Sequence, residues 1–282
     1  MDIQYSLYNL TPKKRANRLS SLEPKTGVYL RAKVGEEYVF ADYFPYSVFG
    51  DKPIDLFLQT FKYQDEVYDR KVFHLLKKDV EYKNTPSTPF RNHQLWTGIE
   101  SLKSPIIKYK ILDQYDTLFL ELLKKGLRIR FDGNACFTRK TYEAFVKQIP
   151  KEYLSLIDYM EDPLKTTDWS GLEFKSARDF VSGGPYDYWI YKANAEFFPK
   201  ASVPIIFSGY IGSELGFWHA YSELIELGSL KLTHGLIIED FYENQRQLFI
   251  GDYHRTFVPD MNAVKNMYQE LYLKEWKTLC WI

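Results

Sequence analysis

The chain has 282 residues, and its 37 basic side chains balance 37 acidic ones, so the formal net charge at pH 7 is zero. This balance argues against a nucleic-acid or membrane surface as a partner, because both attract proteins with an excess of basic residues. Hydrophobic residues make up 45% of the sequence, which suits a globular protein with a sizeable core.

Two widely separated cysteines, Cys136 and Cys280, do not make a disulfide framework in a chain of this length. Residues 1–10 lack the apolar stretch of a signal peptide. The apolar runs are far shorter than the roughly 18 residues that span a membrane. We therefore expect a cytoplasmic protein, either a monomer or a homo-oligomer.

The first 88 residues predict a small α+β unit. Alternating apolar residues on both sides of Gly35 predict a hairpin over 27–43. A helix is expected over 54–62. The polar, turn-rich segment 84–89 is a candidate domain boundary.

Beyond residue 90, short apolar strands alternate with helical patterns. Strands are predicted over 106–111, 127–131, 156–160, 174–177, 186–192, 203–207 and 232–238, and helices over 115–125, 138–148 and 214–227. This alternation predicts parallel βαβ units, which either close into a barrel or form an open doubly wound sheet. A last helix is expected over 260–277.

Charged residues stand at the ends of these predicted strands. Lys108 and Lys110 alternate within one strand, so that both point to the same face. Arg130 and Asp132 share a face of the next strand, and Glu161 ends the one after it. Because the carboxyl ends of parallel strands meet at one rim, we expect these side chains to meet there.

Two later strands add further candidates, Asp179 and Lys192. Three carboxylates that meet repel one another, and a divalent cation removes that repulsion. An all-oxygen ligand set favours Mg²⁺. A metal ion beside a lysine base is suited to removing a proton α to a carboxylate, so a small carboxylate is the expected substrate.

In order and spacing, these segments resemble a known family, the enolase superfamily, and within it the muconate-lactonising and o-succinylbenzoate synthase branch. The segment Lys108-Tyr-Lys110 resembles its Lys-x-Lys motif. The segments that begin at Asp132 (Asp-Gly-Asn) and Glu161 (Glu-Asp-Pro) resemble two of its metal-binding strand ends. Lys192 matches the lysine of a later strand.

The resemblance implies a (β/α)7β-type modified TIM barrel with an α+β capping domain. Residues 1–88 would form the cap and 89–250 the barrel, with the helical tail 251–282 packing back on the cap. The implied reaction is the syn-dehydration of 2-succinyl-6-hydroxy-2,4-cyclohexadiene-1-carboxylate in menaquinone biosynthesis. A racemase of N-acylamino acids or a dipeptide epimerase on the same scaffold is the alternative.

The resemblance also assigns roles to residues. Lys110 would be the base, Lys192 a cation on the opposite face, and Lys108 would orient Lys110 and tune its basicity. The other implied contacts are with Mg²⁺, for which Mn²⁺ is a possible substitute, and with substrate. The expected metal ligands are Asp132, Glu161 and Asp179, and the expected substrate contacts are Arg130, Ser208 and Gly209.

Two features depart from the family pattern. Asp179 stands only 18 residues after Glu161 and lacks the usual acidic neighbour, so a compressed barrel segment is implied. Asp168 and Asp187 therefore compete with Asp179 as the third metal ligand. The chain is also short for the family, which implies that some crossover helices are missing.

Each residue also has a simpler interpretation. The two lysines of the first motif would suit a solvated edge strand, and Asp132 would suit a turn. Arg130 would equally serve as a structural ion-pair partner. A barrel that binds or supports without catalysis is the alternative from another functional class.

Overall fold

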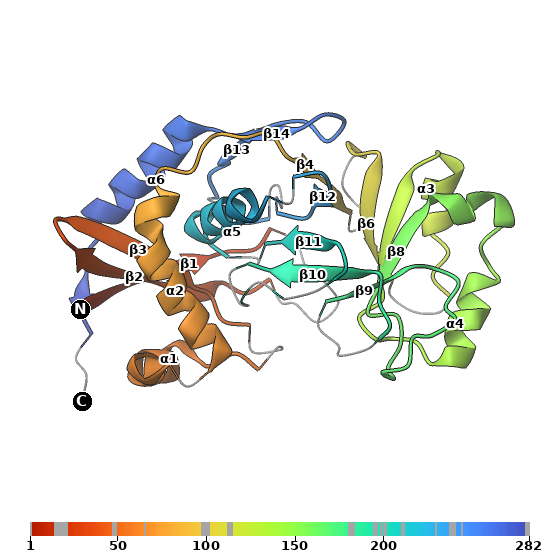
Figure 1. Cartoon of the computed structure of the whole chain (residues 1–282), viewed down its shortest axis with the longest axis horizontal. Helices are drawn as coiled ribbons and strands as arrows, with labels where there is room; N and C mark the ends of the chain where they lie inside the picture. The colour runs from red at the N-terminus through yellow and green to blue at the C-terminus, as the bar shows by residue number, and fades with distance from the viewer. Residues whose placement is uncertain are drawn as a thin grey trace.

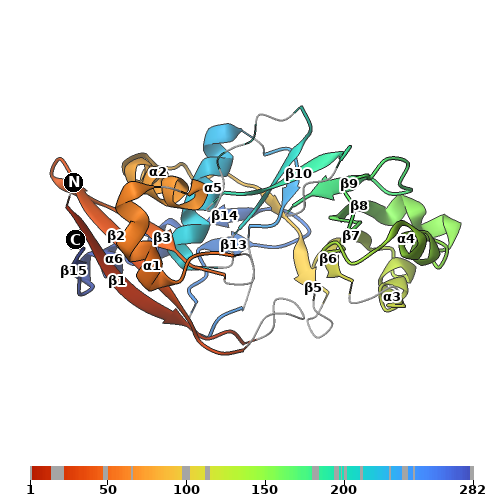
Figure 2. The same ribbon diagram turned by 90° about the horizontal axis from the view of Figure 1, so that it is seen from below.

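The computed structural model describes residues 2–279, apart from 14–21, 47–49, 65, 97–101, 112–114, 180–183, 194–196, 198, 200–201, 210–211, 229, 237–240 and 244. A cap lies at one end of the molecule and a barrel with its outer helices extends to the other (Figures 1 and 2). Within the described residues, no helix is both long and apolar enough to cross a membrane.

The cap is built on an antiparallel sheet with the strand order β15-β1-β2-β3. Its strands are β1 (Ile3–Leu10), β2 (Lys25–Val34), β3 (Glu37–Tyr43) and β15 (Lys277–Thr278). The predicted hairpin is formed by β2 and β3, and its tight turn contains Gly35 at φ 61°. Strand β1 was not predicted from the sequence.

Two helices cover one face of this sheet. They are α1 (Ile54–Thr60), which a 3-10 turn η2 (Phe61–Tyr63) extends, and α2 (Val67–Tyr82). Phe57 of α1 and Leu75 of α2 share a buried apolar cluster with Leu30 of the sheet. The first helix was predicted, whereas α2 was not.

Parallel strands form the barrel. They are β5 (Gln94–Trp96), β6 (Ile106–Lys110), β7 (Arg128–Asp132), β8 (Ile157–Glu161), β9 (Ser176–Arg178), β10 (Tyr188–Lys192) and β11 (Ile205–Ser208), hydrogen-bonded in chain order as one sheet. Two short strands close this sheet, β12 (Thr233–His234) and β4 (Arg91–Asn92), which pair with each other. One residue separates β4 from β5, and Gly235 after β12 bridges to Ser208 of β11. The sheet is therefore a closed barrel, as in the predicted fold class, and not an open doubly wound sheet.

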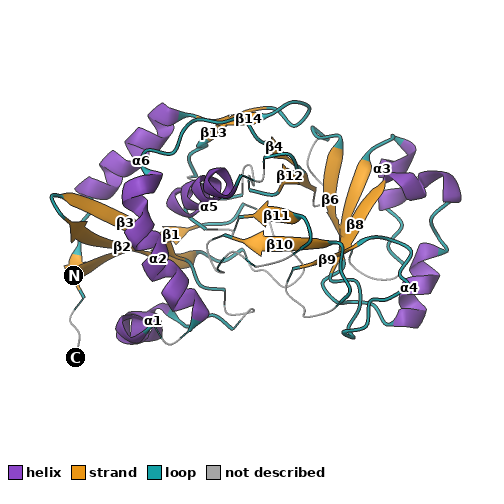
Figure 3. Cartoon of the chain, viewed as in Figure 1, coloured by secondary structure: helices purple, strands orange, loops and turns teal. Residues whose placement is uncertain are grey.

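Few outer helices cover the barrel in the part of the chain that the structure describes, as the short sequence predicted. The described ones are α3 (Phe119–Lys124), α4 (Arg139–Val146) with the 3-10 turn η3 (Lys151–Leu156), and α5 (Glu214–Leu227). Residues 162–175, which link β8 to β9, are all described and contain no helix (Figure 3). Leu164, Trp169 and Phe174 of this loop pack into the outer core where a helix would otherwise lie.

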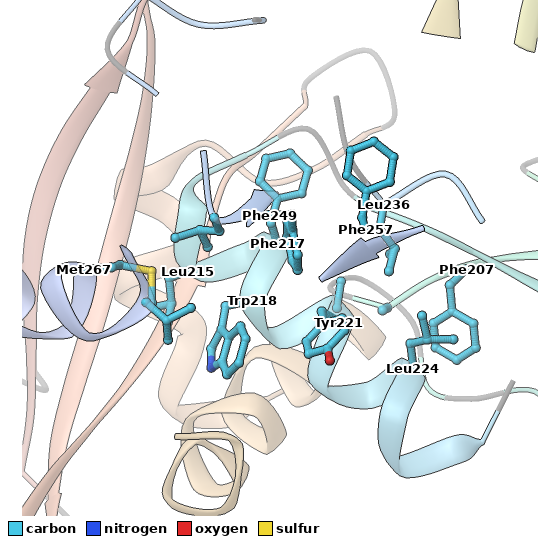
Figure 4. Packing of buried hydrophobic residues seen from close by; sticks show 14 of the residues in the cluster. Phe207, Leu215, Phe217, Trp218, Tyr221, Leu224, Leu236, Phe249, Phe257 and Met267 are labelled. Carbon is cyan, nitrogen blue, oxygen red and sulfur yellow. The ribbon is translucent and has the colours of Figure 1, made fainter. Parts of the chain in front are cut away.

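Helix α5 joins the barrel to the cap. Its residues from Leu215 to Leu224 are all buried, because neighbouring elements cover it on every side. Figure 4 shows Trp218 and Tyr221 of α5 among apolar side chains from the barrel and from the C-terminal segment. One continuous core therefore runs from the barrel into the cap.

The C-terminal segment returns to the cap. It contains the hairpin strands β13 (Phe249–Gly251) and β14 (Phe257–Pro259) and helix α6 (Met261–Leu273), which begins at the N-cap Asp260. The ring of Tyr268 on α6 lies 6.1 Å from that of Phe40 on β3, and β15 pairs with β1. The division of the chain into domains over 1–88, 89–250 and 251–282 stays a prediction.

A buried ion pair fastens the cap to the barrel. Lys71 of α2 is 0% exposed, and its ammonium contacts Glu223 of α5 and donates to the Tyr191 hydroxyl of β10 at 3.1 Å. Replacing Lys71 with methionine leaves the Glu223 carboxylate buried without its cation. We expect the free energy of unfolding, measured with urea, to fall by about 3 to 5 kcal/mol.

Lys78 is the matched control, because it also joins α2 to α5, through Glu226 at 2.8 Å, but it lies at the surface. Its replacement by methionine is expected to cost about 1 kcal/mol or less. Equal losses in the two variants would show that the Lys71 pair does not fasten the cap.

Candidate active site

Alternation along β6 separates apolar from charged side chains. Ile107 and Tyr109 are buried in the outer core beside Phe119 of α3. Lys108 and Lys110 therefore point to the opposite face, toward the barrel interior. Strand β6 pairs with β5 on one side and β7 on the other, so neither lysine lies on a solvated edge strand.

Strand register brings the lysines beside two of the predicted acids. Lys110 is the register partner of Asp132, which in turn pairs with Glu161. Lys108 Nζ lies 2.6 Å from Glu161 Oε2 and 3.3 Å from Asp132 Oδ2. Lys110 Nζ lies 2.9 Å from Asp132 Oδ2. Four of the predicted residues thus form one charged network at the carboxyl ends of three adjacent strands.

Strands β9 to β11 contribute a second ion pair. Lys192, the last residue of β10, donates to Asp179 Oδ2 at 3.0 Å and to Ser208 Oγ at 3.4 Å. Ser208 is the register partner of Lys192 on β11, and Asp179 directly follows β9. The structure therefore places Asp179, Lys192 and Ser208 together.

The two ion-paired groups face each other across the barrel. Three strands separate β6 from β10 on one side, and β11, β12 and the β4–β5 pair separate them on the other. Lys110 and Lys192 end these two opposed strands. A substrate between them would meet one amine on each of its faces.

Burial and charge set the ionisation of this cluster. Burial raises the pKa of Glu161 to about 7, and the negative charges of Asp132 and Asp179 add to that rise. Burial also disfavours the charged form of Asp132, yet the adjacent Lys108 and Lys110 hold the pKa of Asp132 well below its usual range. For Lys108, burial opposes the charge, but the surrounding carboxylates outweigh it and raise the pKa of this lysine. Lys108 therefore remains an ammonium between two acids.

The two competitors for the third acidic position lie elsewhere. The side chain of Asp168 is 73% exposed and binds the backbone N–H and the hydroxyl of Ser170. Asp187 accepts a hydrogen bond from the backbone N–H of Ser176, at the beginning of β9 and so at the opposite end from Asp179. Of the three candidates, Asp179 alone pairs with a lysine of the rim.

Arg130 lies deeper in the barrel, two residues before Asp132. Its guanidinium donates to Asp158 Oδ2 at 3.1 Å and to the Thr233 carbonyl at 2.8 Å, and it lies 2.9 Å from Nδ1 of His93. Arg130 therefore forms a structural ion pair with Asp158, which was the alternative to a substrate contact in the sequence analysis. A contact of Arg130 with substrate stays a prediction.

Close packing around residue 209 explains why a glycine stands there. A Cβ at this position would lie 3.0 Å from the Leu236 carbonyl oxygen and equally close to the Phe217 ring. The glycine therefore lets the chain pass closely over the end of β12 beside Ser208. Its contact with substrate is likewise a prediction.

The donor set suits a hard divalent cation, because it consists of carboxylates from neighbouring strand ends. Asp179 Oδ1 is buried and has no hydrogen-bond partner among the described residues. One oxygen of each predicted ligand faces a lysine: Asp132 Oδ2, Glu161 Oε2 and Asp179 Oδ2. As arranged here, the described residues contain no group of three His, Cys, Asp or Glu side chains ready to hold a metal ion. Metal binding therefore stays a prediction.

No role was predicted for Asp162, although it lies within the Glu-Asp-Pro segment that begins at Glu161. Asp162 is 4% exposed and has a left-handed backbone at φ 41°. Its carboxylate accepts a hydrogen bond from the backbone N–H of Asp179 at 3.1 Å. The only signal in the sequence is its position between a strand-ending glutamate and a proline.

A known protein resembles part of this sequence. The o-succinylbenzoate synthase of Bdellovibrio bacteriovorus is 25% identical over 183 residues, a match that covers 57% of this chain and 56% of that protein. The match thus spans about half the length of the curated relative. No family model matches the chain.

Solved structures share the fold over almost the whole chain. The o-succinylbenzoate synthase of Thermosynechococcus elongatus has a TM-score of 0.70 at 13% identity, over 96% of this chain and 100% of that one. The L-Ala-D/L-Glu epimerase of Bacillus subtilis has a TM-score of 0.64 at 13% identity, over 92% and 95%. The chain is thus similar over part of its length to an o-succinylbenzoate synthase, and it shares its fold with an o-succinylbenzoate synthase and an epimerase.

Proposed function

We propose that the chain is an o-succinylbenzoate synthase, a cytoplasmic dehydratase of menaquinone biosynthesis. Its substrate would be 2-succinyl-6-hydroxy-2,4-cyclohexadiene-1-carboxylate and its products 2-succinylbenzoate and water. The observation that carries the proposal is the pair of opposed lysines, Lys110 and Lys192, each bound to a carboxylate of the rim. The name of the Bdellovibrio bacteriovorus relative supports this choice of reaction.

Lys110 performs both proton transfers in the proposed mechanism. As a neutral amine, it takes the proton from the carbon α to the substrate carboxylate. As an ammonium, it then gives this proton to the departing hydroxyl group, which leaves as water. Because one amine serves both steps, the proton and the hydroxyl leave from the same face of the ring, and no further reactant is needed.

Lys192 and Lys108 act through their charge. Lys192 stays protonated, held by Asp179 and Ser208, and stabilises the delocalised anion from the opposite face by charge and by a cation–π contact. Lys108 links Asp132 with Glu161 and so holds both acids beside Lys110. Ser208 itself would border the substrate.

Asp132, Glu161 and Asp179 are the residues that would hold Mg²⁺, or Mn²⁺ in its place. The Thermosynechococcus elongatus synthase, which shares the fold, is described with magnesium in its active site. When bound, the ion supplies positive charge beside the substrate carboxylate, which stabilises the negative charge that develops there.

The charge of the site favours an anionic substrate. Lys108 and Lys192 contribute two positive charges and a dication contributes two more, against three from the carboxylates, while Lys110 is neutral as a base. One net positive charge therefore remains to attract the substrate carboxylate. This attraction becomes stronger as negative charge develops on the substrate during the reaction.

An activity assay tests the proposal. Purified protein with Mg²⁺ is expected to convert the cyclohexadiene substrate to 2-succinylbenzoate, followed by absorbance. Excess EDTA should abolish turnover and added Mg²⁺ should restore it, because the cation stabilises the negative charge that develops on the substrate. Unchanged turnover after chelation would contradict the metal-dependent mechanism.

An epimerase or N-acylamino acid racemase is the second candidate. The opposed placement of Lys110 and Lys192 favours it as well, because two bases on opposite faces can remove a proton from one side and return it to the other. The Bacillus subtilis epimerase shares the fold. If the assay shows no dehydration while N-acylamino acids or dipeptides exchange their α-proton with deuterium from solvent, the epimerase is the correct assignment.

A further inference from the structure

Asp162 adopts a backbone conformation that most residues avoid. It follows the last residue of β8, has a φ of 41°, and is 4% exposed. Aspartate and asparagine tolerate this left-handed region better than other residues with a side chain, although glycine adopts it most readily. A buried aspartate at such a position needs an explanation in its contacts.

Those contacts join the ends of three neighbouring strands. The backbone N–H of Asp162 donates to the carbonyl of Ala177 on β9 at 2.9 Å. Its backbone carbonyl accepts from the N–H of Ala135, in the loop after β7, at 2.8 Å. Its carboxylate Oδ1 accepts from the N–H of Asp179, just beyond β9, at 3.1 Å. Asp162 thus binds both the loop that follows Asp132 and the segment that contains Asp179.

The hydrogen bond from the Ala135 N–H to the Asp162 carbonyl lies in a loop with an unusual backbone. Asn134 and Ala135 both have left-handed backbones, at φ 45° and 51°, and alanine is unfavourable there. Gly133 lies so close to the end of β8 that a Cβ would be 3.0 Å from the Glu161 carbonyl oxygen. The backbone next to Asp132 is therefore held tightly against the backbone next to Glu161.

We propose that Asp162 is a positioning residue that fixes the spacing of the three carboxylates Asp132, Glu161 and Asp179. This inference rests on the proposed function, in which these carboxylates hold a divalent cation. The side-chain bond of Asp162 determines where the Asp179 backbone lies, and its main-chain bonds determine how closely the ends of β7, β8 and β9 approach.

A metal site needs such support because Mg²⁺ demands nearly ideal octahedral geometry. Groups behind the ligands that hold them in place typically account for 10- to 100-fold in metal affinity. We expect an effect of this size when the Asp162 carboxylate is removed without disturbing its backbone.

Two substitutions separate the side-chain bond from the backbone conformation. Asp162→Gly accepts the left-handed φ but has no acceptor for the Asp179 N–H. Asp162→Asn accepts the same φ and keeps a carbonyl oxygen in the place of Oδ1. Asp187→Ala is the matched control, because Asp187 also accepts a backbone N–H from β9, but at the opposite end of that strand.

The measurement is the affinity for Mn²⁺ in the full chain without substrate, by electron paramagnetic resonance, with the melting temperature of each metal-free variant. Asp162→Gly is expected to bind Mn²⁺ about 10- to 100-fold more weakly than the wild type. Asp162→Asn and Asp187→Ala should remain within about threefold. Wild-type affinity in Asp162→Asn together with a loss in Asp162→Gly distinguishes positioning from a general loss of stability.

Three results would overturn the inference. If the wild type binds Mn²⁺ and Asp162→Gly binds it equally well, Asp162 does not position the carboxylates, and the proposed function is untouched. If Asp162→Asn loses as much affinity for Mn²⁺ as Asp162→Gly, the hydrogen bond from the Asp179 N–H is not the cause of the loss. If the wild type itself binds no Mn²⁺, the proposed function fails and this inference fails with it. Should Asp162→Gly not fold, Asp162→Ser takes its place, because its hydroxyl is too short to reach the Asp179 N–H.

Discussion

Replacing Lys110 with alanine is expected to lower kcat for dehydration by about 10²- to 10⁴-fold, the range that a positioned acid–base group contributes. The effect should lie toward the upper end, because Lys110 serves both proton transfers in the proposed mechanism. The measurement is the initial rate of 2-succinylbenzoate formation at saturating Mg²⁺ and substrate.

The variant must stay folded for this result to bear on the mechanism. Lys110 is bound to Asp132 on the adjacent strand, so a melting curve and a Mn²⁺ titration accompany the assay. Lys124→Ala is the control, because Lys124 is an exposed lysine of α3 that pairs with Glu121 of the same helix. Turnover by a folded Lys110→Ala protein within tenfold of the wild type would remove Lys110 as the base.

Replacing Lys192 with arginine is expected to lower kcat/KM about 100-fold although the positive charge is kept. The ammonium of Lys192 lies between Asp179 Oδ2 and Ser208 Oγ, and a planar guanidinium directs its donors differently and occupies more space. The readout is kcat/KM for the cyclohexadiene substrate, measured together with the melting temperature.

A companion variant, Lys192→Met, tests the charge itself and should be at least as impaired as the arginine variant. If both variants keep nearly wild-type activity, Lys192 does not belong to the site. If dehydration survives in them while the α-proton exchange of an N-acylamino acid is lost, then Lys192 is a base of an epimerase and not the electrostatic partner of a dehydratase.

Much of the barrel could be predicted from local sequence patterns. In β6, apolar Ile107 and Tyr109 alternate with Lys108 and Lys110, and the outer core takes the first pair while the rim takes the second. Because parallel strands in chain order bring their carboxyl ends together, charged residues at successive strand ends had to meet. Strand-end position therefore indicated Lys110, Asp132, Glu161 and Lys192, whereas it left Asp179 open against Asp168 and Asp187.

Features that depend on contacts between distant segments could not be predicted from local sequence patterns, which left a closed barrel and an open sheet as alternatives until the family resemblance favoured the barrel. The closure of the barrel rests on the pairing of Thr233–His234 with Arg91–Asn92, strands of two residues each that have no periodicity of their own. Helix α2 was missed although its buried Lys71 anchors the cap, since the lysine resembles an exposed residue until its partner Glu223 is known. The partners of Arg130 were hidden in the same way.

The loop between β8 and β9 contains no helix, and the ends of both strands nevertheless lie in register at the rim. Leu164, Trp169 and Phe174 shield the outer side of these strands as an irregular cover, and the strand ends nevertheless keep Glu161 and Asp179 at the rim. Register between strands, set by main-chain hydrogen bonds, is thus separable from the nature of the outer shell. We therefore expect an insertion or deletion in this loop to leave the strand ends in place as long as large apolar side chains still exclude water from the outer core.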